Sequence, residues 1–188
     1  ARLTRAIHSK RQLFERVIEF WTDHFNATQD IGSWQRAFRT AADRDVFRQH
    51  ALGNFRDLLM ANAKSAEMLR YLDNVSNEAG APNENYAREL LELHTLGVDG
   101  GYNENDVKEL ARCFTGWNIF SVTTDANFGD FRFKHWNHDG GSKVVLGQTI
   151  PGGGVEEAEG VIDYDKCREV ITSWKGFLED NKNEITLI

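Results

Sequence analysis

The chain has 188 residues, of which 40% are hydrophobic and 27% are charged, and its net charge is −7 at neutral pH. This length supports one domain with its own core, and the acidic balance argues against a general nucleic-acid-binding protein, which needs a basic face. No apolar run approaches the roughly 20 residues that a membrane-spanning helix requires.

Helical periodicity dominates the first part of the chain. Residues 12–25 give the clearest amphipathic pattern, with apolar and charged side chains on opposite sides. Residues 26–42 are expected to form a polar, irregular connection, part of which can be helical. Residues 43–63 predict one helix, or two that bend near Gly53, and Ser65 is a suitable N-cap for a short helix after them.

The second part begins with helices and then changes character. A helix is expected over residues 84–96 with Gly97 as its left-handed cap, and Asn103 with Asp106 resembles a capping box for the next one. Aromatic and β-branched residues then alternate, and FRFKHW and KVVLG, separated by NHDGGS, predict a β-hairpin. PGGGVEEAEG is expected to be a flexible joint before a return to helix over 165–180.

These elements predict a mainly α fold, an irregular multi-helix domain with one β-hairpin near 130–150. Three groups of polar residues on the expected elements are candidates for chemistry.

The first candidate is the stretch NENYARELLELHTLGV, which carries a charged row on one side of its expected helix. Glu84, Arg88 and Glu92 recur at i,i+4 spacing, so the arginine can pair with either carboxylate. Asn85 and Glu89 lie beside this row. The row is either a solvated helix face, or it lines a cleft in which desolvation strengthens the pairs and shifts the carboxylate pKa values.

The second candidate is a pair of histidines on apolar helix faces. His94 lies among leucines, and His24 lies between Val17 and Phe20 on its helix. A buried imidazole must form hydrogen bonds, and burial disfavours its charged form. The two are either core residues bonded to backbone carbonyls, or a metal or proton-transfer pair. The chain has no HExxH or HxH spacing, which weakens the metal interpretation.

The third candidate is KHWNHDGGSK. His138 and Asp139 are adjacent in a glycine-rich turn, and Lys143 adds a cation beside them. Such a pair is either ordinary turn chemistry or a source of a general base or ligand. His135 and His138 need not converge, because neighbours in an extended segment point to opposite faces. The chain has no GxSxG elbow for a serine nucleophile.

With these motifs in view, the chain resembles the bacterial family called domain of unknown function 1800 (DUF1800) over about residues 8–160. The segments that carry the resemblance occur in the family's order: LFERVIEFWTDHF, HALGNFRDLLMANA, AEMLRYLDN, PNENYARELLELHTLGVDGGY, DVKELARCFTGW and HDGGSKVVLG. The resemblance implies a mostly helical fold and a periplasmic or secreted location, but no known reaction. Members are usually longer, so the remaining parts of a full-length family protein are expected partners.

The chain departs from the family pattern in two places. Asp23 stands where the family usually has Asn, and the pattern fades after Gly160. The segment CREVITSWKGFLEDNKNEITLI is similar to the C-terminal part of type I restriction enzyme motor subunits. The expected domains are therefore a DUF1800-like helical domain over 1–160, a fragment of the family protein, and a C-terminal helical tail of doubtful origin over 161–188.

Two functional hypotheses follow. The first is an exported enzyme of hydrolase type with a polar cleft and a divalent metal as a candidate cofactor. Its candidate catalytic residues are Glu89, Glu92, His94, His138 and Asp139, its candidate substrate-binding residues are Asn85, Arg88 and Lys143, and its candidate metal ligands are His24 and His94. The second is a non-catalytic scaffold or partner-binding helical module. Shifted carboxylate pKa values in a cleft would favour the first, and exposed glutamates with separately buried histidines the second.

Overall fold

The computed structural model describes residues 2–27 and 33–162. Its helices up to residue 71 are α1 (Arg2–His8), α2 (Gln12–Phe25), α3 (Ser33–Ala42), the π-helix η1 (Asp43–Phe47), α4 (Arg48–His50), α5 (Phe55–Ala63) and α6 (Ala66–Tyr71). Those that follow are the 3-10 helix η2 (Asn74–Ser76), α7 (Asn85–Glu89), the π-helix η3 (Leu90–Thr95), α8 (Glu104–Cys113), the 3-10 helix η4 (His135–Asn137) and α9 (Glu156–Ile162). The mainly α class is confirmed.

The helices of the first half begin where local sequence signals predict. The Asn54 side chain accepts a hydrogen bond from the Arg56 backbone at the start of α5, and Ser65 accepts one from Met68 at the start of α6. The helical part of residues 26–42 is α3, a regular helix over Ser33–Ala42. Phe38 on α3 is buried in the core, so tertiary packing stabilises a segment whose composition is polar.

The helix predicted over 84–96 forms as α7 followed without a break by η3. Gly97 ends it with φ +84°, the left-handed conformation expected of a cap. The capping box at the start of α8 is also confirmed, since Asn103 accepts from the Asp106 backbone and Asp106 accepts in return from the Asn103 backbone. Local signals therefore fix both helices that carry the charged residues.

The strands form two separate antiparallel pairs. Strand β1 (Trp117–Ile119) pairs with β2 (Phe131–Phe133), and β3 (Lys143–Val145) pairs with β4 (Gln148–Ile150). A hairpin therefore lies within 130–150 as predicted, but the predicted pairing of FRFKHW with KVVLG is wrong.

A tight turn at Leu146 and Gly147 explains this pairing. Both residues have positive φ, +53° and +77°, as a two-residue type I′ connection requires. Leucine rarely adopts this conformation, and here the Leu146 backbone N–H donates to the Asp106 carboxylate at 2.6 Å. An acidic side chain on α8 therefore holds the turn that joins β3 to β4.

The segment PGGGVEEAEG is not wholly a flexible joint, because its second part begins α9. Glu157 and Ala158 are buried there, and the Glu157 carboxylate forms an ion pair with Lys143 on β3. No local sequence pattern predicts this ion pair, because its two residues are 14 positions apart. The helix expected over 165–180 lies outside the described residues.

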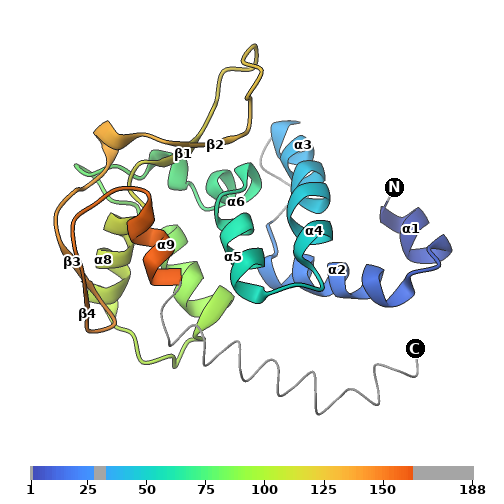
Figure 1. The fold of residues 1–188 in the computed structure, drawn as a ribbon, viewed down its shortest axis with the longest axis horizontal. Coiled ribbons are helices and arrows are strands. Elements are labelled where there is room, and N and C mark those ends of the chain that lie inside the picture. Colours follow the sequence, from blue (N-terminus) through green and yellow to red (C-terminus); the bar gives the residue numbers. More distant parts are fainter. Residues whose placement is uncertain (1, 28–32, 163–188) are drawn as a thin grey trace.

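One continuous hydrophobic core joins the two halves. Figure 1 places α5 and α6 at the centre, α3 and α4 on one side, and α8, α9 and the β3–β4 pair on the other. The most deeply buried large side chains include Trp117, Tyr86, Phe114, Leu58, Leu69, Leu91 and Leu110. Helices α7 and α8 are therefore packed against this core, which fixes the position of their polar residues.

Candidate functional site

The HDGGSK turn is bonded to helix α8. The Arg112 guanidinium donates two hydrogen bonds to the Asp139 carboxylate, at 2.7 and 3.2 Å, and two more to Glu109. These donors lower the pKa of Asp139 to about 2. The Asp139 carboxylate also accepts from the Gly141 backbone, which is the local turn chemistry considered for this motif.

A buried ionic group lies behind this turn. Lys143 donates to the Glu157 carboxylate and to the Asp139 carbonyl, with the Lys143 and Glu157 side chains 0% and 2% exposed. His138 Nε2 lies 3.2 Å from Glu157 Oε1, which is ion-pair distance without the alignment of a hydrogen bond. His138 Nδ1 donates to the Thr115 carbonyl at 2.7 Å. We call Arg112, His138, Asp139, Lys143 and Glu157 the turn network.

The turn network engages its polar groups internally. The His138 side chain is buried within this network, whereas the neighbouring His135 is exposed. The His138 side chain is only 3% exposed, so a substrate in solvent does not reach it. His138, Asp139 and Lys143 therefore have the surroundings of residues that attach the β3–β4 pair to α8 and α9.

The two histidines on apolar faces do meet. Their ring centroids are 6.3 Å apart, and His24 Nε2 donates to the His94 carbonyl at 3.2 Å. Burial, followed by the neighbouring His24, lowers the pKa of His94 to about 3, and burial also lowers that of His24. His94 Nδ1 has no hydrogen-bond partner among the described residues. The pair is thus neutral at physiological pH and lies among aromatic rings.

The charged row of α7 is rearranged at the surface. Arg88 donates to Glu104 on α8 with two bonds of 2.8 Å and to Glu84 with one of 3.1 Å. The expected alternative pairing with Glu92 is not formed among the described residues. Helix η3 begins two residues after Arg88, so Glu92 lies in a segment with a wider turn than the α-helix on which the i,i+4 row was predicted.

Glu89 and Glu92 consequently form a second, different group. Both are partly buried, and neither takes part in a hydrogen bond or ion pair found among the described residues. Burial, and then the charge of Glu92, raises the pKa of the Glu89 carboxyl. Tyr102 lies within the electrostatic influence of Glu92, and its pKa is raised by burial and by that carboxylate. We call Glu89 and Glu92 the carboxylate pair.

The predicted site residues are therefore not linked into one cleft by bonds among the described residues. They divide into the turn network, the His24–His94 pair and the surface of α7 with the carboxylate pair, while Asn85 is exposed at the start of α7. Residues 2–27 and 33–162 contain no group of three or more His, Cys, Asp or Glu side chains arranged to hold a metal ion. The metal hypothesis for His24 and His94 gains no third ligand from them.

Comparison with known proteins gives one match. Residues 1–164 match the family described as Protein of unknown function (DUF1800). The chain belongs to this family. Searches of curated proteins and of solved structures each gave no match. In the part of this DUF1800 chain that the structure describes, no helix is both long and apolar enough to cross a membrane.

The resemblance of the tail to restriction enzyme motor subunits concerns residues 167–188, which lie outside the described residues. The division into a domain over 1–160 and a tail over 161–188 stays a prediction.

Three residues of this DUF1800 chain belong to the candidate sites without having been singled out by their sequence pattern. Arg112 and Glu157 complete the turn network, and Tyr102 accompanies the carboxylate pair. Arg112 falls on the polar side of α8 like any solvated arginine. Glu157 stands in a glycine-rich, acidic stretch that predicts a loop. One feature of the sequence indicates a residue such as Glu157. A lysine in a buried strand, such as Lys143, needs a carboxylate partner.

Proposed function

We propose that this DUF1800 chain is a hydrolase-type enzyme that uses the carboxylate pair for acid–base catalysis. One observation carries the proposal: Glu89 and Glu92 are partly buried beside each other, and burial together with the charge of Glu92 raises the pKa of Glu89 more than the charge of Arg88 lowers it. Placing two like charges together out of bulk water opposes folding, and such arrangements are common where a carboxyl must hold a proton near neutral pH. Glu84 and Glu104, close by, each form an ion pair with Arg88.

The two carboxyls are suited to different roles. The raised pKa of Glu89 favours its protonated form, which can donate a proton to a leaving group. Glu92 is then the base that removes a proton from water, and the resulting oxygen attacks the electrophilic centre of the substrate. The Tyr102 hydroxyl can orient that water or the substrate by hydrogen bonding. Each turnover thus moves one proton from water to Glu92 and one from Glu89 to the leaving group, and proton exchange with solvent then restores the Glu92 carboxylate and the protonated Glu89.

The start of η3 adds a second reason to favour this location. Glu89 is the last residue of α7, and the π-helical stretch follows at once. Such stretches cost hydrogen-bond quality within a helix and are frequent at functional sites. Arg88 is bonded to Glu84 and Glu104, and no ion pair found among the described residues joins it to Glu89 or Glu92.

The test is a hydrolysis assay over a panel of chromogenic esters, phosphate monoesters, glycosides and peptide amides. Glu89→Gln and Glu92→Gln are each expected to reduce the hydrolysed signal by about 100-fold or more, the usual contribution of a general acid or base. Glu78→Gln is the matched control, because Glu78 is an exposed glutamate whose carboxylate bonds to Asn137. Its rate should stay within about twofold of the wild type.

The pH profile gives a second readout. The alkaline limb should lie above the range of an ordinary glutamate, because it reports the loss of the proton from Glu89. Hydrolysis that is unaffected by either substitution, or the lack of any hydrolysis over the whole panel, would overturn the proposal.

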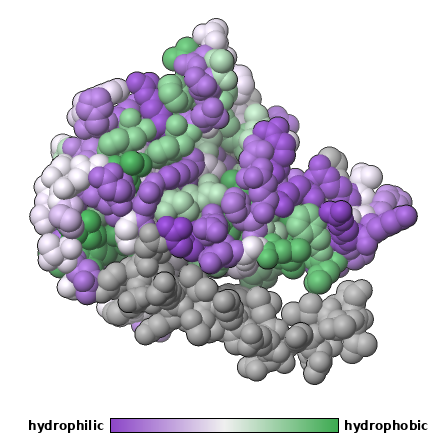
Figure 2. Space-filling model, viewed as in Figure 1, coloured by the Kyte–Doolittle hydropathy of each residue, from purple (hydrophilic) through white to green (hydrophobic). Residues whose placement is uncertain are grey.

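A non-catalytic module is the second candidate, and one observation favours it. Exposed apolar side chains gather on and around α1 and α2, where Figure 2 shows a hydrophobic area along α2. They are Leu3, Ile7, Leu13, Phe20 and Leu52. Two hollows of about 500 Å³ open at this surface and are lined in part by residues of both charges, including Arg11, Glu15 and Glu19.

Such mixed charge around an apolar centre can be self-complementary, so the proposed occupant is a second copy of this chain in a two-fold arrangement. Sedimentation velocity should then show a dimer that Leu13→Glu abolishes. A wild-type chain that stays monomeric at high concentration would remove this candidate.

A further inference from the structure

Arg132 lies between two aromatic rings on the far side of the strand from the core. Its guanidinium carbon is 5.1 Å from the Phe120 ring centroid and 5.4 Å from that of Trp136. Cation–π contacts at both rings hold the guanidinium plane in place. We call Phe120, Arg132 and Trp136 the Arg132 platform.

The backbone of β2 determines which side chains join the platform. Phe131 and Phe133 pack against the core, so Arg132 between them leaves the strand on the opposite side. Lys134 follows Arg132 by two residues, just after the end of β2, and adds a second cation near the platform. Asp130 comes two residues before Arg132 and bears the opposite charge.

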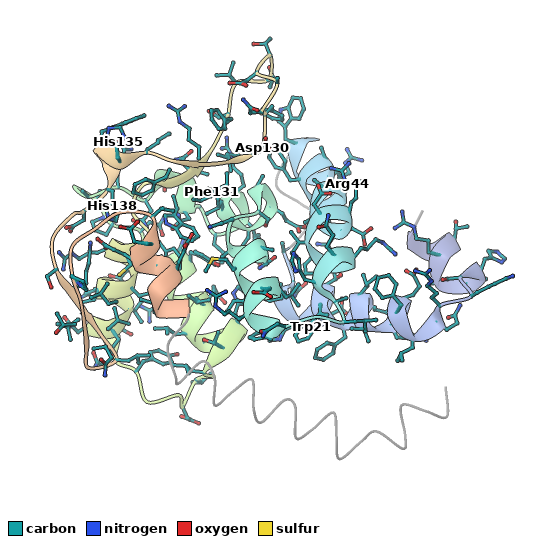
Figure 3. All side chains as sticks on the ribbon, viewed as in Figure 1. Trp21, Arg44, Asp130, Phe131, His135 and His138 are labelled. Carbon is teal, nitrogen blue, oxygen red and sulfur yellow. The ribbon has the colours of Figure 1, made fainter. Side chains whose placement is uncertain are left out.

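Trp136 is the exposed part of the platform. It is 60% exposed, although tryptophan buries more apolar surface than any other side chain when it enters a core. The neighbouring His135 is also exposed, and its ring meets the indole edge-to-face with centroids 4.9 Å apart. Figure 3 shows His135 at the outer edge of the molecule. The indole is therefore held in place while more than half of it faces solvent.

The guanidinium of Arg132 differs from the other positioned arginines. Arg88 and Arg112 are each paired with two carboxylates. Arg132 has no hydrogen bond or ion pair among those found for the described residues. A stacked guanidinium keeps its five N–H donors at the edge of its plane, where they match a carboxylate in two-point contact. The platform thus joins an open aromatic surface to an unpaired, oriented cation.

We propose that the Arg132 platform binds an acidic polysaccharide, a chain of sugar rings that carry carboxylates. The C–H face of a pyranose ring bears partial positive charge and is complementary to the negative face of an indole such as Trp136. The carboxylate of the same or the next sugar can then accept two hydrogen bonds from Arg132, and Lys134 can contact a further carboxylate. This site is separate from the carboxylate pair, so it does not rest on the proposed hydrolase activity.

The small number of cations near the platform favours a ligand that gains from stacking as well as from charge. The affinity of a nucleic acid depends on neutralising many phosphates. The net charge of −7 opposes any long polyanion, and the cations near the platform are Arg132, Lys134 and the exposed His135 when protonated. Each pyranose of a polyuronate offers a C–H face to Trp136 and a carboxylate to Arg132, so a single sugar can satisfy both parts of the platform.

The experiment is calorimetric titration of the whole chain with polygalacturonate, using dextran as the neutral polymer and single-stranded oligothymidylate as the nucleic acid. Polygalacturonate should bind, dextran should bind at least about tenfold more weakly, and raised salt should reduce the affinity. Trp136→Ala and Arg132→Gln should each weaken binding by about tenfold. Arg132→Lys should recover only part of the loss, since it keeps the charge without the two-point geometry.

Trp34→Ala is the matched control, because Trp34 is 54% exposed and contacts Phe128 rather than the platform. It should bind polygalacturonate within about twofold of the wild type. Thermal melting verifies that each variant is folded. Polygalacturonate that does not bind, binding that is unchanged in the Trp136 and Arg132 variants, or tighter binding of oligothymidylate would each overturn the proposal.

Discussion

The turn network and the carboxylate pair contain similar charged residues in opposite surroundings. In the turn network, Lys143 and Glu157 are buried and bonded to each other. In the carboxylate pair, Glu89 and Glu92 are partly exposed and no described residue pairs with them. Buried and paired ions attach one element to another, whereas unpaired carboxylates at a surface are available to react. The neighbours of a charged residue therefore decide its role more than its type.

Removing one member of the turn network should have the largest effect. Lys143→Met leaves the Glu157 carboxylate buried without its lysine, and losing one partner of a buried pair costs about 3–5 kcal/mol. We expect the free energy of unfolding to fall by that amount in urea denaturation followed by circular dichroism. Lys108→Met is the control, since Lys108 is exposed on α8, and its effect should stay within about 0.5 kcal/mol.

A loss below about 1 kcal/mol for Lys143→Met would contradict the buried pairing. The double variant Lys143→Met, Glu157→Gln offers a further check, because it removes both charges. It should be more stable than Lys143→Met alone.

Much of the fold could be predicted from local sequence, because its determinants are local. Ser65, Asn103 and Gly97 act within a few residues of their own position, and each is found where its pattern places it. The β-strand pairing could not be predicted, since the left-handed Leu146 depends on a bond from Asp106, 40 residues away. Leucine at that position gives no turn signal by itself.

The candidate sites divide in the same way. The sequence identifies His94 as buried because helical periodicity determines the face of a residue. Periodicity also predicts that Arg88 can pair with either Glu84 or Glu92; the pair with Glu84 forms, and Glu92 belongs to the π-helical segment that follows. The π-helical segment is stabilised by tertiary packing of Leu90, Leu91 and His94, which a single sequence does not display.

The buried His94 should give the next largest effect, as a dependence of stability on pH. Its pKa is about 3 in the folded chain and near 6.5 when exposed by unfolding. Between these values the unfolded state binds the proton more readily, so lowering the pH favours unfolding. Below about pH 6 the wild type should lose on the order of 1 kcal/mol per pH unit relative to His94→Gln.

The measurement is the free energy of unfolding at several pH values from 7 down to about 4.5. His135→Gln, a change at an exposed histidine, should retain the wild-type slope. If His94→Gln has the same slope as the wild type, His94 is not held neutral by burial. The histidine pair would then be accessible to solvent, like the carboxylate pair and unlike the turn network.

The smallest expected change in stability is at the carboxylate pair, and its sign is opposite. Glu89→Gln removes a partly buried carboxyl beside Glu92, and this carboxyl forms no ion pair found among the described residues. Relief of like-charge repulsion on a helix is worth a few tenths of a kcal/mol, so the variant should be as stable as the wild type or slightly more stable. Thermal melting at neutral pH measures this change in stability directly.

Stability retained together with the loss of hydrolysis would mean that the carboxylate is kept for reaction and not for folding, as expected of residues at functional sites. A fall of more than about 1 kcal/mol would instead indicate a stabilising partner for Glu89 and place it with the paired ions of the turn network.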